Sequence, residues 1–190
     1  LVTFSDVALG DNVVDIQVEG DGNLMYQITG GYYLPYDALD SYPDLVAEQE
    51  LVDIAVSYDR TELAMNDSVQ VDVSVKMNAD GGTADWAIVD LGIPPGFTVN
   101  TEDLNALVAR SSDIPEDYTG TTVEKYELTG RQVIVYLGNL NAEASFDFSY
   151  RMTAKYPLKA QTPASSAYDY YNPSVSGEKR PLMLTVVNNE

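Results

Sequence analysis

The amino-acid sequence predicts an all-β fold: an antiparallel β-sandwich with one short helix, preceded by a partial β unit. Three observations lead to this fold class. Short segments alternate apolar and polar residues, turn-forming residues separate these segments, and a single segment carries its apolar residues at helical spacing. Alternation with a period of two is typical of strands with one buried face, and many short strands joined by turns are typical of a sandwich.

The partial β unit is expected over residues 1–38. Within it, the alternating segments 12–18 and 24–28 flank the triplet Asp21-Gly22-Asn23. A short turn that contains glycine between two alternating segments is typical of a β-hairpin. We therefore predict a hairpin here.

A linker and a complete sandwich domain are expected after this unit. Residues 39–49 are acidic and show no clear period, which predicts a linker. Residues 50–190 contain the sandwich, and its expected strands are residues 51–58, 69–77, 86–91, 123–128, 132–136, 144–154 and 182–187. The first two of these strands have clear core faces, formed by Val52, Ile54, Val56 and Tyr58 and by Val69, Val71, Val73, Val75 and Met77.

One helix is expected to interrupt the strands, beginning after Asn100. Asparagine is a favourable N-cap residue, and the acidic residues Glu102 and Asp103 follow in the first turn, where the helix dipole favours negative charge. Apolar residues then recur at helical spacing, at Leu104, Leu107 and Val108. We expect this apolar stripe to pack against the sandwich.

The charge balance limits the classes of partner. Thirty Asp and Glu residues stand against ten Lys and Arg residues, and the net charge is −20. Nucleic acid binding needs clustered Lys and Arg, so it is not expected. Contact with an anionic membrane surface is not expected for the same reason. Because the acidic residues are dispersed along the chain, they indicate a well-solvated surface, and adaptation to high salt or a cationic partner is the alternative.

Missing residue types exclude several kinds of active site. The chain contains no cysteine and no histidine, so thiol nucleophiles, disulfides and Ser–His catalysis are excluded within it. The turns at 21–23 and 78–81 are rich in Asp and Asn, but they lack the spacing of an EF-hand calcium loop. We therefore predict that the chain is not an enzyme and has no catalytic residue, cofactor or metal.

Aromatic residues are the remaining candidates for a functional site. The segment 150–173 leads from an alternating strand through prolines to three tyrosines, Tyr168, Tyr170 and Tyr171. Each tyrosine combines a large apolar ring with one polar group, so such a cluster indicates packed surroundings with hydrogen-bond partners. The single tryptophan, Trp86, lies in a predicted strand and is expected to be a core residue.

Four motifs in sequence order resemble a known protein family. They are Asp90-Leu91-Gly92-Ile93-Pro94-Pro95-Gly96-Phe97, the hairpin from Tyr126 to Leu137 with its turn at Thr129-Gly130, the segment from Phe146 to Pro157, and Ala167-Tyr168-Asp169-Tyr170-Tyr171-Asn172-Pro173. Together they resemble the C-terminal region of the bacterial-type alpha-2-macroglobulin family. The resemblance covers roughly residues 50–175 and implies a macroglobulin receptor-binding domain with an immunoglobulin-like sandwich. Residues 1–38 resemble the second half of the CUB-type domain that precedes it.

The resemblance implies a function for a longer parent protein. Members of this family trap proteases, and a reactive thioester in an upstream domain couples to the target. This chain begins at Leu1 in strand-like sequence, which suggests a piece of a longer polypeptide, and it has no cysteine for a thioester. It would then be the non-catalytic C-terminal domain of a protease inhibitor, outside the cell or in the periplasm or cell envelope. Its partners would be the thioester domain of the same parent and, through the parent, target proteases.

The resemblance also bears on individual residues. Tyr168, Tyr170 and Tyr171 are candidates for the interface with the thioester domain, and a structural role in the core is the alternative. Vertebrate members bind a clearance receptor through two lysines on the helix. The corresponding positions here are about Thr101 and Asn105, so binding to that type of receptor is not expected.

A second class of function stays open from the sequence. The chain could be a generic β-sandwich adhesion module or a carbohydrate-binding module of an exported surface protein. A carbohydrate-binding module would need an exposed aromatic strip around Trp86 or the tyrosines.

Overall fold

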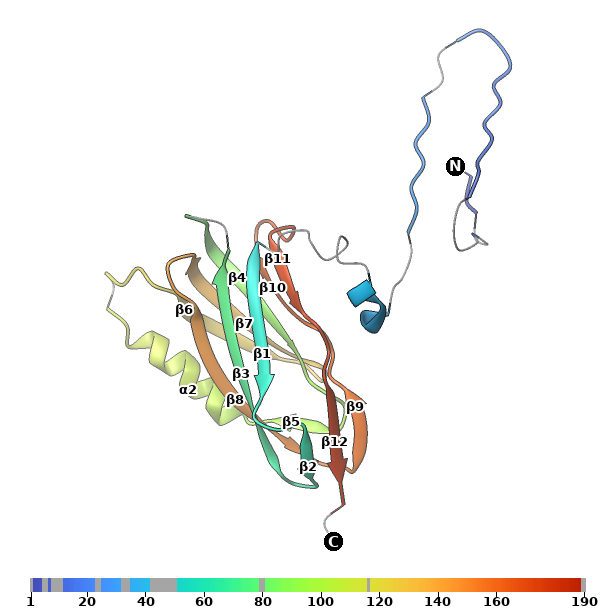
Figure 1. The fold of residues 1–190 in the computed structure, drawn as a ribbon. Coiled ribbons are helices and arrows are strands. Elements are labelled where there is room, and N and C mark those ends of the chain that lie inside the picture. Colours follow the sequence, from blue (N-terminus) through green and yellow to red (C-terminus); the bar gives the residue numbers. More distant parts are fainter. Residues whose placement is uncertain are drawn as a thin grey trace. The chain divides into compact units, whose positions relative to one another are not determined.

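The computed structural model describes residues 2–4, 7, 12–22, 25–31, 35–41, 51–78, 81–115 and 117–188. The chain divides into two compact units, Leu1–Leu34 and Pro35–Glu190. Only the second unit contains helices and strands among its described residues (Figure 1).

The described residues of the predicted hairpin form no strands. The described residues of segments 12–18 and 25–28 are not in strands, and their side chains are exposed, with Val13 91% and Met25 96% accessible. Asn23 of the predicted turn and Leu24 lie outside the described residues. A lone two-stranded hairpin is at best marginally stable because it has no second layer on which to bury its apolar face. The alternation therefore indicates residues suited to a sheet, but they form no sheet here.

The second unit is the predicted β-sandwich. In chain order, its elements are the short 3-10 helix η1 (Tyr36–Ser41), β1 (Val52–Tyr58), β2 (Glu62–Ala64), β3 (Ser68–Met77), β4 (Thr83–Gly92), β5 (Phe97–Val99), helix α2 (Thr101–Ser112), β6 (Thr122–Leu128), β7 (Gln132–Asn141), β8 (Phe146–Ala154), β9 (Leu158–Gln161), β10 (Ser165–Asp169), β11 (Ser176–Lys179) and β12 (Met183–Val187). The fold class predicted from the sequence is confirmed.

These strands form two larger sheets and one small sheet. The strand orders are β1-β3-β8-β5, β11-β10-β4-β7-β6 and β2-β12-β9. Neighbouring strands are antiparallel except for β2 and β12, which pair in parallel. Helix α2 contacts β6 of the five-stranded sheet and β8 of the four-stranded sheet (Figure 1). The main core lies between the two larger sheets.

The alternation in β1 and β3 places the predicted residues in this core. Val52, Ile54 and Val56 are at most 5% accessible, and Tyr58 is half-buried. The five core residues predicted on β3 are also buried. Each buried valine of this kind contributes about 1.5–3 kcal/mol through removal of apolar surface from water. The core faces predicted for these two strands are therefore confirmed.

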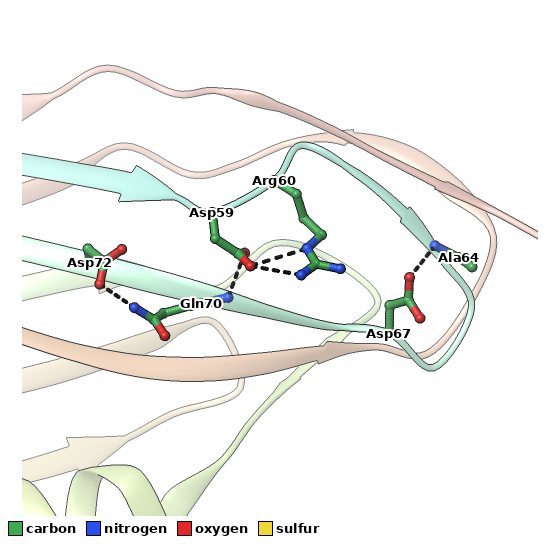
Figure 2. Close-up of polar contacts among 6 residues, drawn as sticks. All are labelled: Asp59, Arg60, Ala64, Asp67, Gln70 and Asp72. Carbon is green, nitrogen blue, oxygen red and sulfur yellow. Dashed lines mark hydrogen bonds and ion pairs between the residues drawn. The ribbon is translucent and has the colours of Figure 1, made fainter.

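Aspartate side chains close the turns around β2 (Figure 2). Asp59 Oδ1 accepts a hydrogen bond from the backbone N–H of Gln70 at 2.9 Å, and Asp59 Oδ2 accepts one from Arg60 Nε at 3.2 Å. The bond from Gln70 is the main reason that the pKa of Asp59 is lowered. Asp67 Oδ2 accepts from the Ala64 N–H at 3.0 Å. These bonds hold the β1–β2 and β2–β3 connections through local side-chain capping of the backbone.

The predicted helix is also confirmed. Asn100 Oδ1 accepts a hydrogen bond from the N–H of Glu102 at 2.9 Å, as expected for an N-cap. Leu104 and Leu107 are buried, and Val108 packs partly against the same core. Thr101 and Asn105 lie on the exposed side, where Asn105 Oδ1 accepts a hydrogen bond from the Tyr126 hydroxyl at 2.8 Å.

Candidate functional site: an exposed aromatic sheet face

The outer face of the five-stranded sheet carries a row of large side chains. Ile88 on β4 stands opposite Tyr168 on β10 and Tyr136 on β7, and Tyr136 stands opposite Lys125 on β6. Residues directly opposite in neighbouring antiparallel strands point to the same face of a sheet. Ala87 and Val89, on either side of Ile88, lie in the core, so this row is on the outer side of the sheet, where Ile88 itself is only 8% accessible.

Trp86 lies in the next row of the same face. Its side chain is 38% accessible, so the prediction that it is a core residue is wrong. The adjacent residue Ala87 occupies the core position, which turns the indole outward. The residue opposite Trp86 on β7 is Gly138, which has no side chain to cover the indole.

The loop between β10 and β11 presents two of the predicted tyrosines. The backbone N–H of Tyr170 donates to the Trp86 carbonyl oxygen at 2.9 Å. Asp169 Oδ1 accepts from the N–H groups of Tyr171 and Asn172 at 2.7 and 3.1 Å, and the Asp169 N–H donates to the Val175 carbonyl at 3.0 Å. An aspartate that caps the backbone in this way is typical of a tight, well-defined turn. The loop therefore has a fixed backbone although its side chains are exposed.

Tyr170 and Tyr171 pack against each other at the surface. Their ring centroids are 5.1 Å apart with an interplanar angle of 87°, an edge-to-face arrangement. They are 51% and 74% accessible, so the alternative core role does not apply to these two tyrosines. Tyr168 is half-buried. The structure thus brings the three predicted tyrosines to one region, with two of them open to solvent.

We call this surface the aromatic face, and it consists of Trp86, Ile88, Tyr136, Tyr168, Tyr170 and Tyr171. Tyr136 and Ile88 were not identified from the sequence. The alternation in residues 132–136 contained a signal for Tyr136, because Val133 and Val135 take the core positions and leave Ile134 and Tyr136 on the opposite side. Apolar residues on both sides of a strand indicate that its outer side is also used for contact.

A lysine already lies on this face. Lys125 Nζ is 4.1 Å from the centroid of the Tyr136 ring and 2.6 Å from Glu127 Oε1. The hydrogen bond with Glu127 is the largest cause of the raised pKa of Lys125, and the nearby Tyr136 and Tyr170 act in the same direction. A cation over the electron-rich face of an aromatic ring is a favourable contact.

Carboxylates border the aromatic rings. Asp90 follows Ile88 on the same face, and burial raises its pKa. Its Oδ2 accepts a hydrogen bond from Gln132 Nε2 at 2.6 Å. The pKa of Tyr168 is raised, first by burial and then by the charge of Asp90 and by Tyr136. The face is therefore both aromatic and acidic.

The side chains of the aromatic face are suited to binding a partner. A shallow hollow of about 310 Å³ lies beside Tyr168, lined by Ser166, Tyr168, Pro173, Ser176, Gly177 and Glu178.

None of the described residues forms a cluster of three or more carboxylates that could hold a metal ion. Within the described ranges, the helices are too short or too polar to cross a membrane.

Comparison with known protein families finds a match for this chain. The sequence model of the family described as the A-macroglobulin receptor binding domain matches residues 82–180. Comparison with curated protein sequences finds no match. The matched region runs from β4 to the end of β11 and contains every residue of the aromatic face.

Solved structures of bacterial alpha-2-macroglobulins share the fold. The crystal structure of native Escherichia coli alpha-2-macroglobulin from domain MG7 to the C-terminus has a TM-score of 0.58 and 17% identity, covering 72% of this chain and 23% of that one. The cryo-EM native conformation of the E. coli protein has a TM-score of 0.58 and 16% identity, with 72% and 9% covered. A mutant of Salmonella alpha-2-macroglobulin has a TM-score of 0.57 and 14% identity, again with 72% and 9% covered.

The chain spans less than a quarter of the length of these structures. At such low identity the structural similarity shows the fold, whereas the sequence match over residues 82–180 shows the family. The resemblance drawn from the four sequence motifs is confirmed. The chain belongs to the A-macroglobulin receptor binding domain family.

Proposed function

We propose that this chain is the non-catalytic C-terminal part of an alpha-2-macroglobulin-like protease inhibitor. The aromatic face is its contact surface with another domain of the same parent, the thioester domain. The observation that carries this proposal is the exposure of Trp86, Tyr170 and Tyr171 on backbone held by hydrogen bonds. The similar solved structures are parts of much longer alpha-2-macroglobulin chains, which supports a parent with further domains.

Exposed aromatic residues in fixed positions favour an interface. Tyr and Trp are enriched among the residues that dominate binding energy, because they bury a large area with little loss of side-chain freedom. A contiguous exposed apolar patch on a soluble protein is a typical sign of an interaction site. The β10–β11 loop supplies such residues without needing to order itself on binding, which lowers the entropic cost of the contact.

The proposal includes a division of the chain. Residues 1–38 belong to a CUB-type domain of the parent, residues 39–49 are a linker, and residues 50–190 are the receptor-binding domain. The 3-10 helix η1 spans the first of these boundaries, and residues 42–49 of the linker lie outside the described residues. The exposure of the described apolar residues in the first unit supports this division, because those residues would be buried once the rest of such a domain is present. The parent acts outside the cell or in the periplasm or cell envelope, where it meets proteases.

The parent protein provides the test. Incubated with trypsin, it should protect a large protein substrate from cleavage while a small peptide substrate is still cut, because a trap excludes substrates by size. Tyr170→Ala with Tyr171→Ala in the parent should impair this protection, whereas Tyr156→Ala, an exposed tyrosine on the β8–β9 connection, should not. Equal cleavage of large and small substrates by the parent–trypsin mixture would contradict the proposal.

A carbohydrate-binding module is the second candidate, and one observation favours it. Trp86 and the two loop tyrosines form the exposed aromatic group that such a module requires. The perpendicular rings of Tyr170 and Tyr171 weigh against it, since two rings at 87° cannot both stack flat on one sugar chain. Binding of a neutral oligosaccharide to the chain, with a change in Trp86 fluorescence, would favour this candidate.

A further inference from the structure

We propose that the segment covering the aromatic face carries a lysine or arginine side chain, and that this cation lies between the Trp86 ring and the Glu124 carboxylate. The identity of the partner as another domain of the parent rests on the proposed function above. The preference for a cation rests on residues of this chain alone.

Lys125 shows how the face holds an ammonium group. Its Nζ lies over the Tyr136 ring of β7 at 4.1 Å from the centroid, and it meets the Glu127 carboxylate of β6 at 2.6 Å. The ring offers its negative face and the carboxylate offers a charge-assisted hydrogen bond. A ring on a central strand and a carboxylate on β6 together make a cation site.

The next row also has an aromatic ring and a carboxylate, but its ring is Trp86 on β4, one strand further from β6. Trp86 stands opposite Gly138, and Gly138 stands opposite Thr122 on β6. A Cβ atom added to Gly138 would lie 2.8 Å from Glu124 Oε1, so the Glu124 carboxylate reaches over the glycine toward the Trp86 row. The Thr122 hydroxyl donates a hydrogen bond to Glu124 Oε1 at 2.8 Å and orients it. Ring and carboxylate are therefore present, and an incoming segment can supply the cation.

Tyr170 strengthens this second position. It is the strand neighbour of Trp86 through the 2.9 Å backbone hydrogen bond, and its side chain is 51% accessible. Two adjacent aromatic side chains offer a cation and its aliphatic stem more contact area than one ring does. Tryptophan is also the ring with the strongest cation–π attraction.

Charge complementarity excludes other partner chemistries. The chain has a net charge of −20, and the carboxylates of Asp90, Glu124 and Glu127 lie around these rings, where Lys125 is already paired with Glu127. An acidic segment would be repelled. A purely apolar segment would bury carboxylates without a counter-charge, which is unfavourable. A segment with a lysine or arginine among apolar residues matches both the rings and the charge.

The single tryptophan makes the test specific, because intrinsic tryptophan fluorescence of this chain reports on Trp86 alone. The probe is an acetylated, amidated pentapeptide Gly-Leu-Arg-Leu-Gly, and the matched control replaces arginine with citrulline, which has the same shape and no charge. The arginine peptide should change the Trp86 signal saturably and bind about tenfold more tightly than the citrulline peptide. Raising the salt concentration from about 0.05 M to about 0.5 M should weaken the binding of the arginine peptide but not that of the citrulline peptide.

Variants of the chain test which residues bind the cation. Glu124→Gln should remove most of the preference for the arginine peptide over the citrulline peptide. Tyr170→Ala should weaken the binding of both peptides. Glu62→Gln, an exposed carboxylate on β2 in another sheet, should leave binding unchanged. Because these side chains are exposed, the variants are expected to fold, and circular dichroism of each variant checks this.

Several results would overturn the inference. Equal binding of both peptides would show apolar contact without a cation site, and no response to either peptide would show no such site. A response to a neutral oligosaccharide such as chitohexaose, but not to arginine, would indicate a glycan surface. The trypsin assay of the parent is independent of these results. Protection without a preference for arginine overturns only the cation site, and a preference for arginine without protection overturns only the proposed function.

Discussion

The backbone N–H of Tyr170 donates a hydrogen bond of 2.9 Å to the carbonyl oxygen of Trp86. This bond continues the β10–β4 ladder by one residue beyond the pair Asp169 and Ala87. It sets the only tryptophan of the chain beside the exposed tyrosine pair, on the outer face of the five-stranded sheet. Two features that are 84 positions apart in the sequence thus form one surface, and the proposed interface depends on this juxtaposition.

Substitution of Tyr170 should have little effect on stability. Tyr170→Ala is expected to change the free energy of unfolding by about 1 kcal/mol or less, because the ring is exposed and loses mainly its contact with Tyr171. Tyr150→Ala is the contrasting variant, since Tyr150 is 2% accessible, and its loss should cost about 3–5 kcal/mol. Urea denaturation followed by circular dichroism measures both. A loss for Tyr170→Ala as large as that for Tyr150→Ala would place Tyr170 in the core.

An ion pair connects helix α2 to β8. Arg151 donates from Nε to Asp103 Oδ2 at 2.9 Å and from its terminal nitrogen to Oδ1 at 2.7 Å, and the Arg151 backbone N–H also donates to Oδ2. Asp103→Asn should lower the free energy of unfolding at pH 7 by about 0.5–1 kcal/mol, since the pair is partly exposed. Glu62→Gln serves as the control.

The same pair should give a dependence on pH. The hydrogen bond from Arg151 is the largest cause of the lowered pKa of Asp103 in the folded state. A carboxyl whose folded pKa lies below its unfolded value stabilises the fold at higher pH, and this contribution is lost as the pH falls through the folded pKa. The difference in melting temperature between the wild type and Asp103→Asn should therefore be full at pH 7 and shrink below about pH 4. A difference that stays constant down to pH 2 would contradict this role of the ion pair.

Gly96 should tolerate a side chain poorly. Its φ angle is +80°, where residues other than glycine are strained, and an added Cβ would lie 2.3 Å from Leu158 Cδ2, the end of a side chain that would have to shift. We expect a loss of about 1–3 kcal/mol in the free energy of unfolding. Gly130→Ala is the matched control, because an added Cβ there meets no atom within 4 Å. Equal stability of the two variants in urea denaturation would show that the β4–β5 connection rearranges freely.

The isolated chain should inhibit no protease. On the proposed function, trapping needs the cleavage-sensitive and thioester-bearing parts of the parent, and this chain has no cysteine to form a thioester. A molar excess of the chain over trypsin should leave cleavage of a protein substrate unchanged. Stoichiometric inhibition by the chain alone would contradict its assignment as a non-catalytic domain of a trap.

Long alternating segments made the centre of the fold predictable from the sequence. In β1 and β3, seven and ten residues supply enough alternation to identify both the strand and its core face. The strands β2, β5, β9, β10 and β11 have three to five residues each and show little alternation, so they were not predicted from the sequence. Their positions are set by pairing with longer strands.

The candidate site was predictable only in part, because sheet register is not visible in the sequence. The tyrosines at 168, 170 and 171 were identified by their density in a short segment. Which residues stand beside them depends on the pairing of β10 with β4 and of β4 with β7, a long-range feature. Trp86 shows the same limit, since its exposure results from the core position of Ala87 and the absence of a side chain at Gly138.

Hydroxyl-radical footprinting of the parent protein tests the central claim most directly. The oxidation rates of Trp86, Tyr170 and Tyr171 are measured by mass spectrometry in the isolated 190-residue chain and within the intact parent before it meets a protease. If the aromatic face contacts another domain, all three residues should be oxidised readily in the isolated chain and be strongly protected in the parent. Equal oxidation of the three residues in both proteins would contradict the account.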